Sequence, residues 1–279
     1  MSKKKKTVFI AVWLVLIVAL TVGAIIAPAA SGEKEAIKDA MQDAVLHGLN
    51  KVNFLGLEVN PAVVSGFILT GILLLFAAAV RIFAVPRFKE IPGKFQTVIE
   101  TAVGFFDNLA KTNSPQRNSF LGAYIFSAGT YIFIGTLFEL FGIEVMTTEG
   151  MPISLPAPLS DINAAIMMGF VSYGVILGGG LVGNGLKGVG GALKDFSLPI
   201  SMSFRLFGAL LSGALVTELV YHYVSLSFVL PVAVGVLFTL LHAIIQTYVL
   251  TMLTSVFYGE AAERKPKKTK KAGKSLTEV

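Results

Sequence analysis

Six apolar stretches, each about 20 residues or longer, restrict this chain to one class of fold. About 20 apolar residues are enough for one α-helix to cross a bilayer, because the helix rises about 1.5 Å per residue. A helix also satisfies its own backbone hydrogen bonds, which lipid cannot do. The sequence therefore predicts an all-α, polytopic membrane protein of about six transmembrane helices. The stretches are Thr7 to Ile26, Pro61 to about Val85, Phe120 to Phe141, Asp161 through the glycine-rich residues to Lys187, Leu198 to about Val224, and Leu230 to about Tyr258.

The composition and the charge distribution agree with this class. Of the residues, 54% are hydrophobic and 14% are charged, whereas soluble domains are near one-quarter charged. The formal net charge of +6 does not indicate nucleic-acid binding, because the positive residues gather at the two ends and between Arg81 and Lys94. That distribution is typical of anchoring at the cytoplasmic surface of a membrane that contains anionic lipid.

Several kinds of chemical site are absent from the sequence. There is no Cys, so the chain has no disulfide, no thiolate ligand and no thiolate nucleophile. The three histidines (His47, His222 and His242) lack the spacing of metal ligands. The glycine run from Gly178 to Gly191 lacks the ending of a phosphate-binding loop, so we expect it to let helices approach closely. We expect neither a metal nor a cofactor.

The first 30 residues have two interpretations. Lys3 to Lys6 precede the first apolar stretch, and Ala27-Pro28-Ala29 resembles a signal-peptide cleavage site. The stretch is longer than a signal core of about 7–15 residues, which slightly favours a retained helix; its removal would leave five transmembrane helices. Either way residues 31–60 lie outside, where apolar side chains at helical spacing from Ala36 to Val45 predict an amphipathic helix.

Positive residues orient the remaining spans. Arg81, Arg87 and Lys89 follow the second span, while the loop 143–161 contains acids and no Lys or Arg. Lys and Arg favour the cytoplasmic side, so the first region should face inward and the second outward.

Two further regions complete the predicted organisation. The amphipathic stretch from Phe95 to Leu109 is expected along the cytoplasmic interface. The main membrane domain then covers residues 61–260, and residues 261–279 form a basic tail on the cytoplasmic side.

One span contains an arginine. Arg205 lies in an apolar segment that begins at Leu198 and continues to Val220. An arginine near mid-membrane costs roughly 2.5–3.5 kcal/mol on insertion scales, and a guanidinium does not lower that cost by losing its proton. Such a residue normally faces protein or water and marks an ion path, although a snorkelling or carbonyl-bonded structural arginine is the alternative.

The last two spans carry further polar side chains. Glu218 lies thirteen residues after Arg205, on roughly the opposite side of a helix, so the two are not expected to pair. Thr239, His242 and Gln246 follow at intervals of three and four residues and form one stripe. This stripe either bonds neighbouring helices together or lines a hydrated half-channel, with Glu218 and His242 as titratable stations.

Four segments of the chain point to one known family. The two specific segments contain Arg205 and Gln246, and Ile91 to Gln96 and Asp161 to Asn163 support them in the expected order. In these segments the chain resembles subunit a of the F-type ATP synthase, over roughly Pro61 to Tyr258. The segments read Ser203-Phe204-Arg205-Leu206-Phe207-Gly208, Ile245-Gln246-Thr247-Tyr248-Val249-Leu250-Thr251-Met252-Leu253, Ile91-Pro92-Gly93-Lys94-Phe95-Gln96 and Asp161-Ile162-Asn163.

The resemblance implies a non-catalytic, ion-translocating stator subunit. In the family, subunit a lies beside a rotating ring of c subunits, together with the b-subunit stator, in the bacterial inner membrane. Two offset half-channels let H⁺ or Na⁺ reach a carboxyl group on the ring, and the matching arginine, here Arg205, lies between them. The last two helices form a long tilted hairpin against the ring with Gln246 near the arginine, and Asp161 and Asn163 are expected on the ion route. The sequence does not choose between H⁺ and Na⁺.

Three positions depart from the family pattern. Ala209 stands where Asn is common, Ala214 where an acidic or polar residue is common, and Thr239 where an acid or His is frequent. Our hypothesis is that Glu218 and His242 replace the usual groups of the entry channel.

Two other functions stay open at the level of sequence. A stand-alone secondary transporter could use Arg205 to bind an anionic substrate, but we find no paired broken helices around a midplane site. A structural scaffold of a membrane complex would use the polar stripe only to bond helices together.

Overall fold

The computed structural model describes residues 51–263 apart from residues 55, 149, 151 and 223–229, together with Val15, Val18 and Val22. The first predicted span, the amphipathic helix expected around residues 36–45 and the basic tail from residue 264 lie outside this described part. Within it, helices form most of the chain, and two short β-hairpins and the connecting loops form the rest. The elements are β1 (Val52–Phe54), β2 (Leu57–Val59), α3 (Pro61–Ala79), α4 (Lys94–Asn113), α5 (Ser119–Phe138), β3 (Glu144–Met146), β4 (Pro152–Ser154), α6 (Ile162–Asn184), α7 (Leu186–Ala192), α8 (Ser197–His222) and α9 (Leu230–Ala262).

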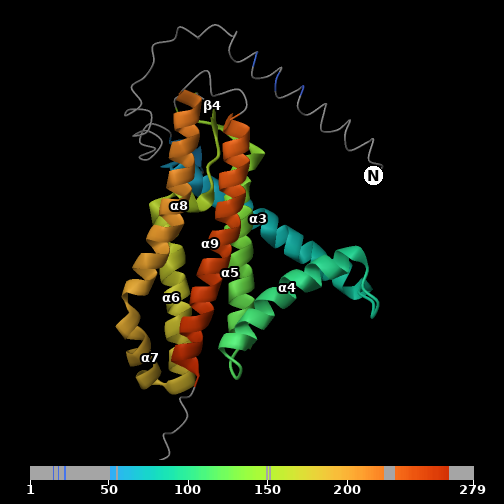
Figure 1. Cartoon of the computed structure of the whole chain (residues 1–279), viewed down its shortest axis with the longest axis vertical. Coiled ribbons are helices and arrows are strands. Elements are labelled where there is room, and N and C mark those ends of the chain that lie inside the picture. The colour runs from blue at the N-terminus through green and yellow to red at the C-terminus, as the bar shows by residue number, and fades with distance from the viewer. Residues whose placement is uncertain are drawn as a thin grey trace, which may run out of the picture.

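Four of these helices, α5, α6, α8 and α9, run along the long axis of the molecule and pack as a bundle, as Figure 1 shows. Helices α3 and α4 lean away from the bundle on one side. A π-helical turn (Val80–Ala84) and a 3₁₀ turn (Val85–Arg87) extend α3 at its outlying end. The two hairpins lie at one end of the bundle, which we call the hairpin end, and α7 lies at the other, which we call the α7 end.

Four helices of the described part are long and apolar enough to cross a membrane. The helix α7 and the start of α8 are bent by 48° at a short break, and they make a fifth span if the bent pair counts as one. This composition is that of a mostly helical, multi-pass membrane protein. The four helices cover Pro61–Arg87, Ser119–Phe141, Ile162–Asn184 and Gly235–Ala262.

The helix starts follow from short polar signals in the sequence. Asn60 caps α3 and is followed by Pro61 at the first helical position, where the missing backbone N–H costs nothing. Asp161 caps α6 in the same way. At the other end of α6, Gly185 adopts a positive φ of 63°, which lets the chain leave the helix.

The two β-hairpins correct the expectation of a purely α-helical chain. Strands β1 and β2 pair across a turn in which Gly56 has φ 85°, and β3 pairs with β4 inside the proline-containing loop 143–161. The backbone N–H of Thr148 donates to the carbonyl of Lys51 at 2.9 Å and joins the two hairpins. Each strand has three residues, too few for an alternating pattern to be recognised in the sequence.

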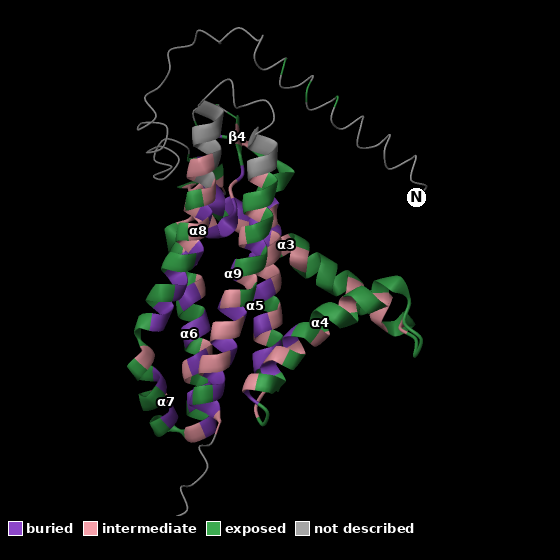
Figure 2. Cartoon of the chain, in the orientation of Figure 1, coloured by how far each residue is buried: buried purple, intermediate pink, exposed green. Residues whose placement is uncertain are grey.

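Buried residues gather between α5, α6, α8 and α9, as Figure 2 shows, whereas the outlying parts of α3 and α4 are mainly exposed. The glycine run allows this packing. A Cβ on Gly179 would collide with the ring of Tyr258, and one on Gly183 would collide with the backbone of Ala262. The expectation that these glycines let helices approach closely is confirmed.

Helix α4 is amphipathic, as predicted, but extends four residues beyond the expected end. Phe106 and Ala110 are buried against the bundle, while Phe95 and Val98 near its start are more than half exposed. The apolar face thus meets protein only in its second half. An exposed apolar first half suits a helix at a membrane interface.

Candidate functional site

Helices α8 and α9 meet at the predicted arginine and glutamine. The side chain of Gln246 is buried, and its Nε2 donates a hydrogen bond of 3.2 Å to the backbone carbonyl of Arg205. Lipid offers no acceptor for an amide, so this contact satisfies Gln246 and joins the two helices at the level of Arg205.

The contact uses the backbone carbonyl of Arg205, and no hydrogen bond joins Gln246 to the Arg205 guanidinium. Arg205 is exposed, and no residue in the described part of the chain gives its side chain a hydrogen bond or an ion pair. Small residues at helical spacing share its face of α8 and are exposed as well. They are Ser201, Gly208 and Ser212. The arginine is therefore the one large polar group on a face that another helix could approach closely.

A different face of α8 packs on α6. Met202, Ser203 and Leu206 are buried there. Gly169 of α6 lies directly against this face, because a Cβ at Gly169 would be 2.7 Å from the carbonyl oxygen of Pro199 and closer still to Ser203 Oγ. The rotation of α8 that leaves Arg205 exposed is thus set by a backbone-level contact. Sequence reasoning missed the contact between Gly169 and Ser203, because a single glycine outside the dense run gave no signal and Ser203 was noted only as part of the segment around Arg205.

His242 lies on the side of α9 that faces α8. Its side chain is half-buried, its ring centroid is 5.8 Å from that of Phe238, and its Nδ1 faces α8 at Gly213, where an added Cβ would be 3.7 Å away. Of the polar stripe, His242 and Gln246 therefore face α8. Glu218 belongs to α8, but its side chain lies outside the described part.

Asp161 and Asn163 stand at the hairpin end of the bundle, away from the Gln246–Arg205 contact. Oδ1 of Asp161 accepts hydrogen bonds from the backbone N–H groups of Asn163 (2.8 Å) and Ala164 (3.1 Å). Oδ2 accepts a third from Nδ2 of Asn60 (2.8 Å). The side chain of Asn163 is exposed. Asn60 was not predicted as part of any site, although an Asn followed by Pro is a common helix start.

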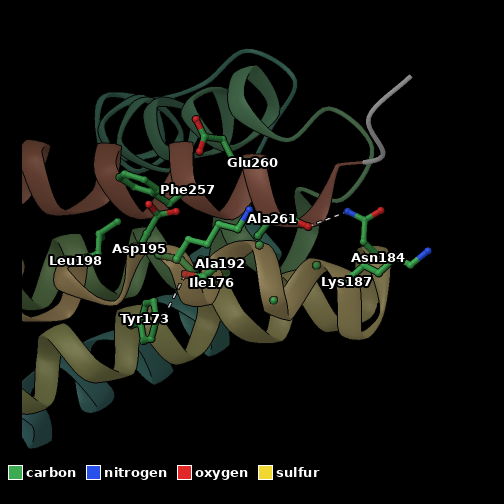
Figure 3. Close-up of a pocket in the computed structure, with 14 residues that line it drawn as sticks. Tyr173, Ile176, Asn184, Lys187, Ala192, Asp195, Leu198, Phe257, Glu260 and Ala261 are labelled. Atoms are coloured by element: carbon green, nitrogen blue, oxygen red, sulfur yellow. Dashed lines mark hydrogen bonds between the residues drawn. The ribbon is translucent and has the colours of Figure 1, made fainter. Parts of the chain in front are cut away.

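A cavity of about 970 Å³ lies at the α7 end, between α6, α7, α8 and α9. Figure 3 shows Leu198 and Asp195 toward one end of it and Asn184 and Lys187 toward the other. Its charged lining residues are Lys187, Lys194, Asp195 and Glu260. In the described part of the chain no three His, Asp or Glu side chains come together as a metal site. The cavity can hold water and charged groups, and the sequence did not single out Asp195 or Glu260.

Comparison with known proteins identifies the family of this chain. Residues 63–259 match the family model described as ATP synthase A chain. Over 202 residues the chain is 25% identical to ATP synthase subunit a of Cereibacter sphaeroides (strain ATCC 17025 / ATH 2.4.3). The alignment covers 68% of this chain and 77% of that protein. The matched model spans most of the chain and includes both Arg205 and Gln246. The chain therefore belongs to the family of subunit a of the F-type ATP synthase.

Proposed function

We propose that this protein conducts H⁺ or Na⁺ through two half-channels and uses Arg205 to make that flow rotate a c-ring. Membership of the family implies a subunit of the membrane sector that takes part in ion translocation with other ATP synthase subunits and is not itself catalytic. The proposal adds the residues, the route and the partners: a c-ring, a b-subunit stator, and a bacterial inner membrane with the C-terminus on the cytoplasmic side.

The observation that carries the proposal is the exposed side chain of Arg205, which pairs with no residue in the described part of the chain. A charged group on an apolar helix is costly without a partner, and no described residue of the chain supplies one. Ser201, Gly208 and Ser212 beside it would let a rotor helix approach closely. A carboxylate on such a helix is the partner that this face lacks.

The electrostatics of that encounter would couple ion flow to rotation. At 4 Å and an effective dielectric constant near 20, two unit charges attract by roughly 4 kcal/mol. The attraction would favour the deprotonated ring carboxylate beside Arg205, and the same positive charge would repel an ion that leaks directly between the half-channels. Each charge that crosses 100 mV releases about 2.3 kcal/mol, which would drive the rotation.

The two ends of the bundle offer a route for each half-channel. Glu218 and His242 would carry ions on the hairpin side of Arg205, with Asp161 and Asn163 beside the entrance. The cavity at the α7 end, lined by charged residues, is suited to the second half-channel. Gln246 would hold α9 against α8 at the point where the two routes are separated.

Replacement of Arg205 tests the proposal. In the complete ATP synthase, we expect Arg205→Ala to abolish ion-driven ATP synthesis while the complex still assembles. Synthesis would be measured in reconstituted vesicles, and co-isolation with the c-ring would be the control for assembly. Retained coupling in Arg205→Ala would contradict the proposal.

Purification of the chain, alone and in its complex, also distinguishes this proposal from a stand-alone transporter and from a structural scaffold. If the isolated chain transported an anionic substrate into liposomes, it would be the stand-alone transporter with Arg205 as its binding residue. If the complex kept full coupling without the arginine, the chain would be a scaffold in which the polar stripe only bonds helices together.

A further inference from the structure

Two helix starts that lie far apart in the sequence are joined by one pair of side chains. Asn60, which precedes α3, donates from Nδ2 to Oδ2 of Asp161, 101 residues later, at 2.8 Å. Oδ1 of Asn60 accepts from the backbone N–H of Ala62 at 2.9 Å. Oδ1 of Asp161 accepts from the first backbone N–H groups of α6. Both side chains are part-buried.

Each side chain in this pair has two functions at once. Asn60 caps α3 with its oxygen and contacts Asp161 with its nitrogen, while Asp161 caps α6 with one oxygen and accepts from Asn60 with the other. The bond between them is charge-assisted, which makes it stronger than a neutral one. The carboxylate accepts three hydrogen bonds from two helix starts, which suits Asp161 to hold the two helices together.

The pair is connected to the arginine through α6. Gly169 lies eight residues after Asp161, or about 12 Å along the helix. At Gly169 the backbone of α6 lies against α8, where an added Cβ would be 2.7 Å from the carbonyl oxygen of Pro199 and 3.3 Å from the backbone nitrogen of Ser203. Ser203 is two residues before Arg205. Gly169 has no side chain that could change rotamer, so its backbone is in direct contact with α8. A displacement of α6 would therefore also displace α8.

We propose that Asn60 and Asp161 form a clamp that sets the position of Arg205, with Asp161 as a positioning residue and not an ion-carrying one. The clamp holds the start of α6 against the start of α3, and α6 in turn holds α8. This inference rests on the proposed function of Arg205, because positioning matters only if the guanidinium must meet a partner.

Single substitutions in the complete ATP synthase test the clamp through two quantities, the thermal stability of the complex and its rate of ATP synthesis. In Asn60→Ala and Asp161→Ala, loss of a helix cap should lower the temperature at which the chain leaves the solubilised complex by about 2–4 °C. Coupled ATP synthesis per assembled complex should fall in both variants. Asp161→Asn should lie between the wild type and Asp161→Ala in both quantities, because Oδ1 of the Asn still caps α6, whereas its Nδ2 would face Nδ2 of Asn60, which is also a donor.

A charge exchange makes the test specific. Asn60→Asp alone would put two carboxylates at the 2.8 Å separation that a hydrogen bond now spans, so it should be the most damaging single variant. The double variant Asn60→Asp with Asp161→Asn restores one donor and one carboxylate, and it should recover both the release temperature and the synthesis. Asn108→Ala is the matched control, because Asn108 is exposed and no described residue bonds its side chain; it should change neither quantity.

Two results would overturn the clamp. One is loss of synthesis in Asp161→Asn at an unchanged release temperature, which would assign the carboxylate to the ion path. The other is a double variant no better than Asn60→Asp alone. Failure of the proposed function is recognised by a different result, namely retained coupling in Arg205→Ala. The release temperatures of the clamp variants do not depend on coupling, so the two failures are distinguishable.

Discussion

The side chain of Gln246 both satisfies its own amide on a membrane helix and joins α9 to α8. Its amide must be satisfied, because lipid offers no hydrogen-bond partner, and it is satisfied by the backbone carbonyl of Arg205. The bond uses the backbone carbonyl of Arg205, so Gln246 does not engage the guanidinium of Arg205. A glutamine here can therefore hold the helix that carries the arginine without neutralising the arginine.

At the same level, His242 and Glu218 are predicted to act as the entry-channel groups of this chain. We expect Glu218→Ala and His242→Ala each to lower ion-driven ATP synthesis at least about tenfold, because a missing proton carrier typically costs a factor of 10² to 10⁴. Synthesis in vesicles at a fixed ion gradient measures this, with ATP hydrolysis by the detached soluble sector as a control. Unchanged synthesis in both variants would show that the channel groups were not relocated to these positions.

At the level of elements, the contact between α6 and α8 determines which face of α8 is exposed. Gly169 lets the backbones touch, so Met202, Ser203 and Leu206 turn inward and Arg205 turns outward. A bulky residue at Gly169 would separate the helices and change that rotation.

Substitution of this glycine gives a clear prediction. Gly169→Val should destabilise the chain by about 2–3 kcal/mol or more, because an overpacked core forces backbone shifts. Coupled synthesis should fall with it. Gly174→Ala is the matched control on the same helix, since nothing lies within 4 Å of an added Cβ there, and it should be neutral or stabilising by up to about 1 kcal/mol. Thermal release from the solubilised complex measures both, and equal behaviour of the two variants would contradict this role of Gly169.

For the whole molecule, the bundle separates two chemically different ends. The hairpin end carries the Asn60–Asp161 pair and the loop 143–161, which has no Lys or Arg, whereas the α7 end carries Lys187, Lys194 and the charged cavity. Positive residues favour the cytoplasmic side, so the α7 end should face the cytoplasm.

The absence of Cys from the sequence makes that orientation testable. Glu144→Cys in β3 and Lys187→Cys in α7 place single thiols on exposed residues at opposite ends. In intact cells, a membrane-impermeant thiol reagent should label the first and not the second, and inverted vesicles should reverse the pattern. Labelling of both from the same side would refute the predicted topology.

The sequence alone was enough to indicate the membrane class, the approximate bounds of the apolar spans within the described part, and the polar positions Arg205 and Gln246 on two of the apolar helices. These features depend on local properties: the length of an apolar stretch, the cost of a charge within it, and the spacing of polar residues along one helix. The helix starts at Asn60 and Asp161 were also readable as local caps.

Only the tertiary structure decided which of these residues meet. The bond between Asn60 and Asp161, the contact of Gly169 with Ser203, and the carbonyl of Arg205 as the partner of Gln246 all join segments distant in sequence. The three-residue strands of the hairpins likewise depend on pairing rather than on pattern. Helix periodicity shows which face of a segment is polar, but the neighbour on that face is set by how the helices pack against one another.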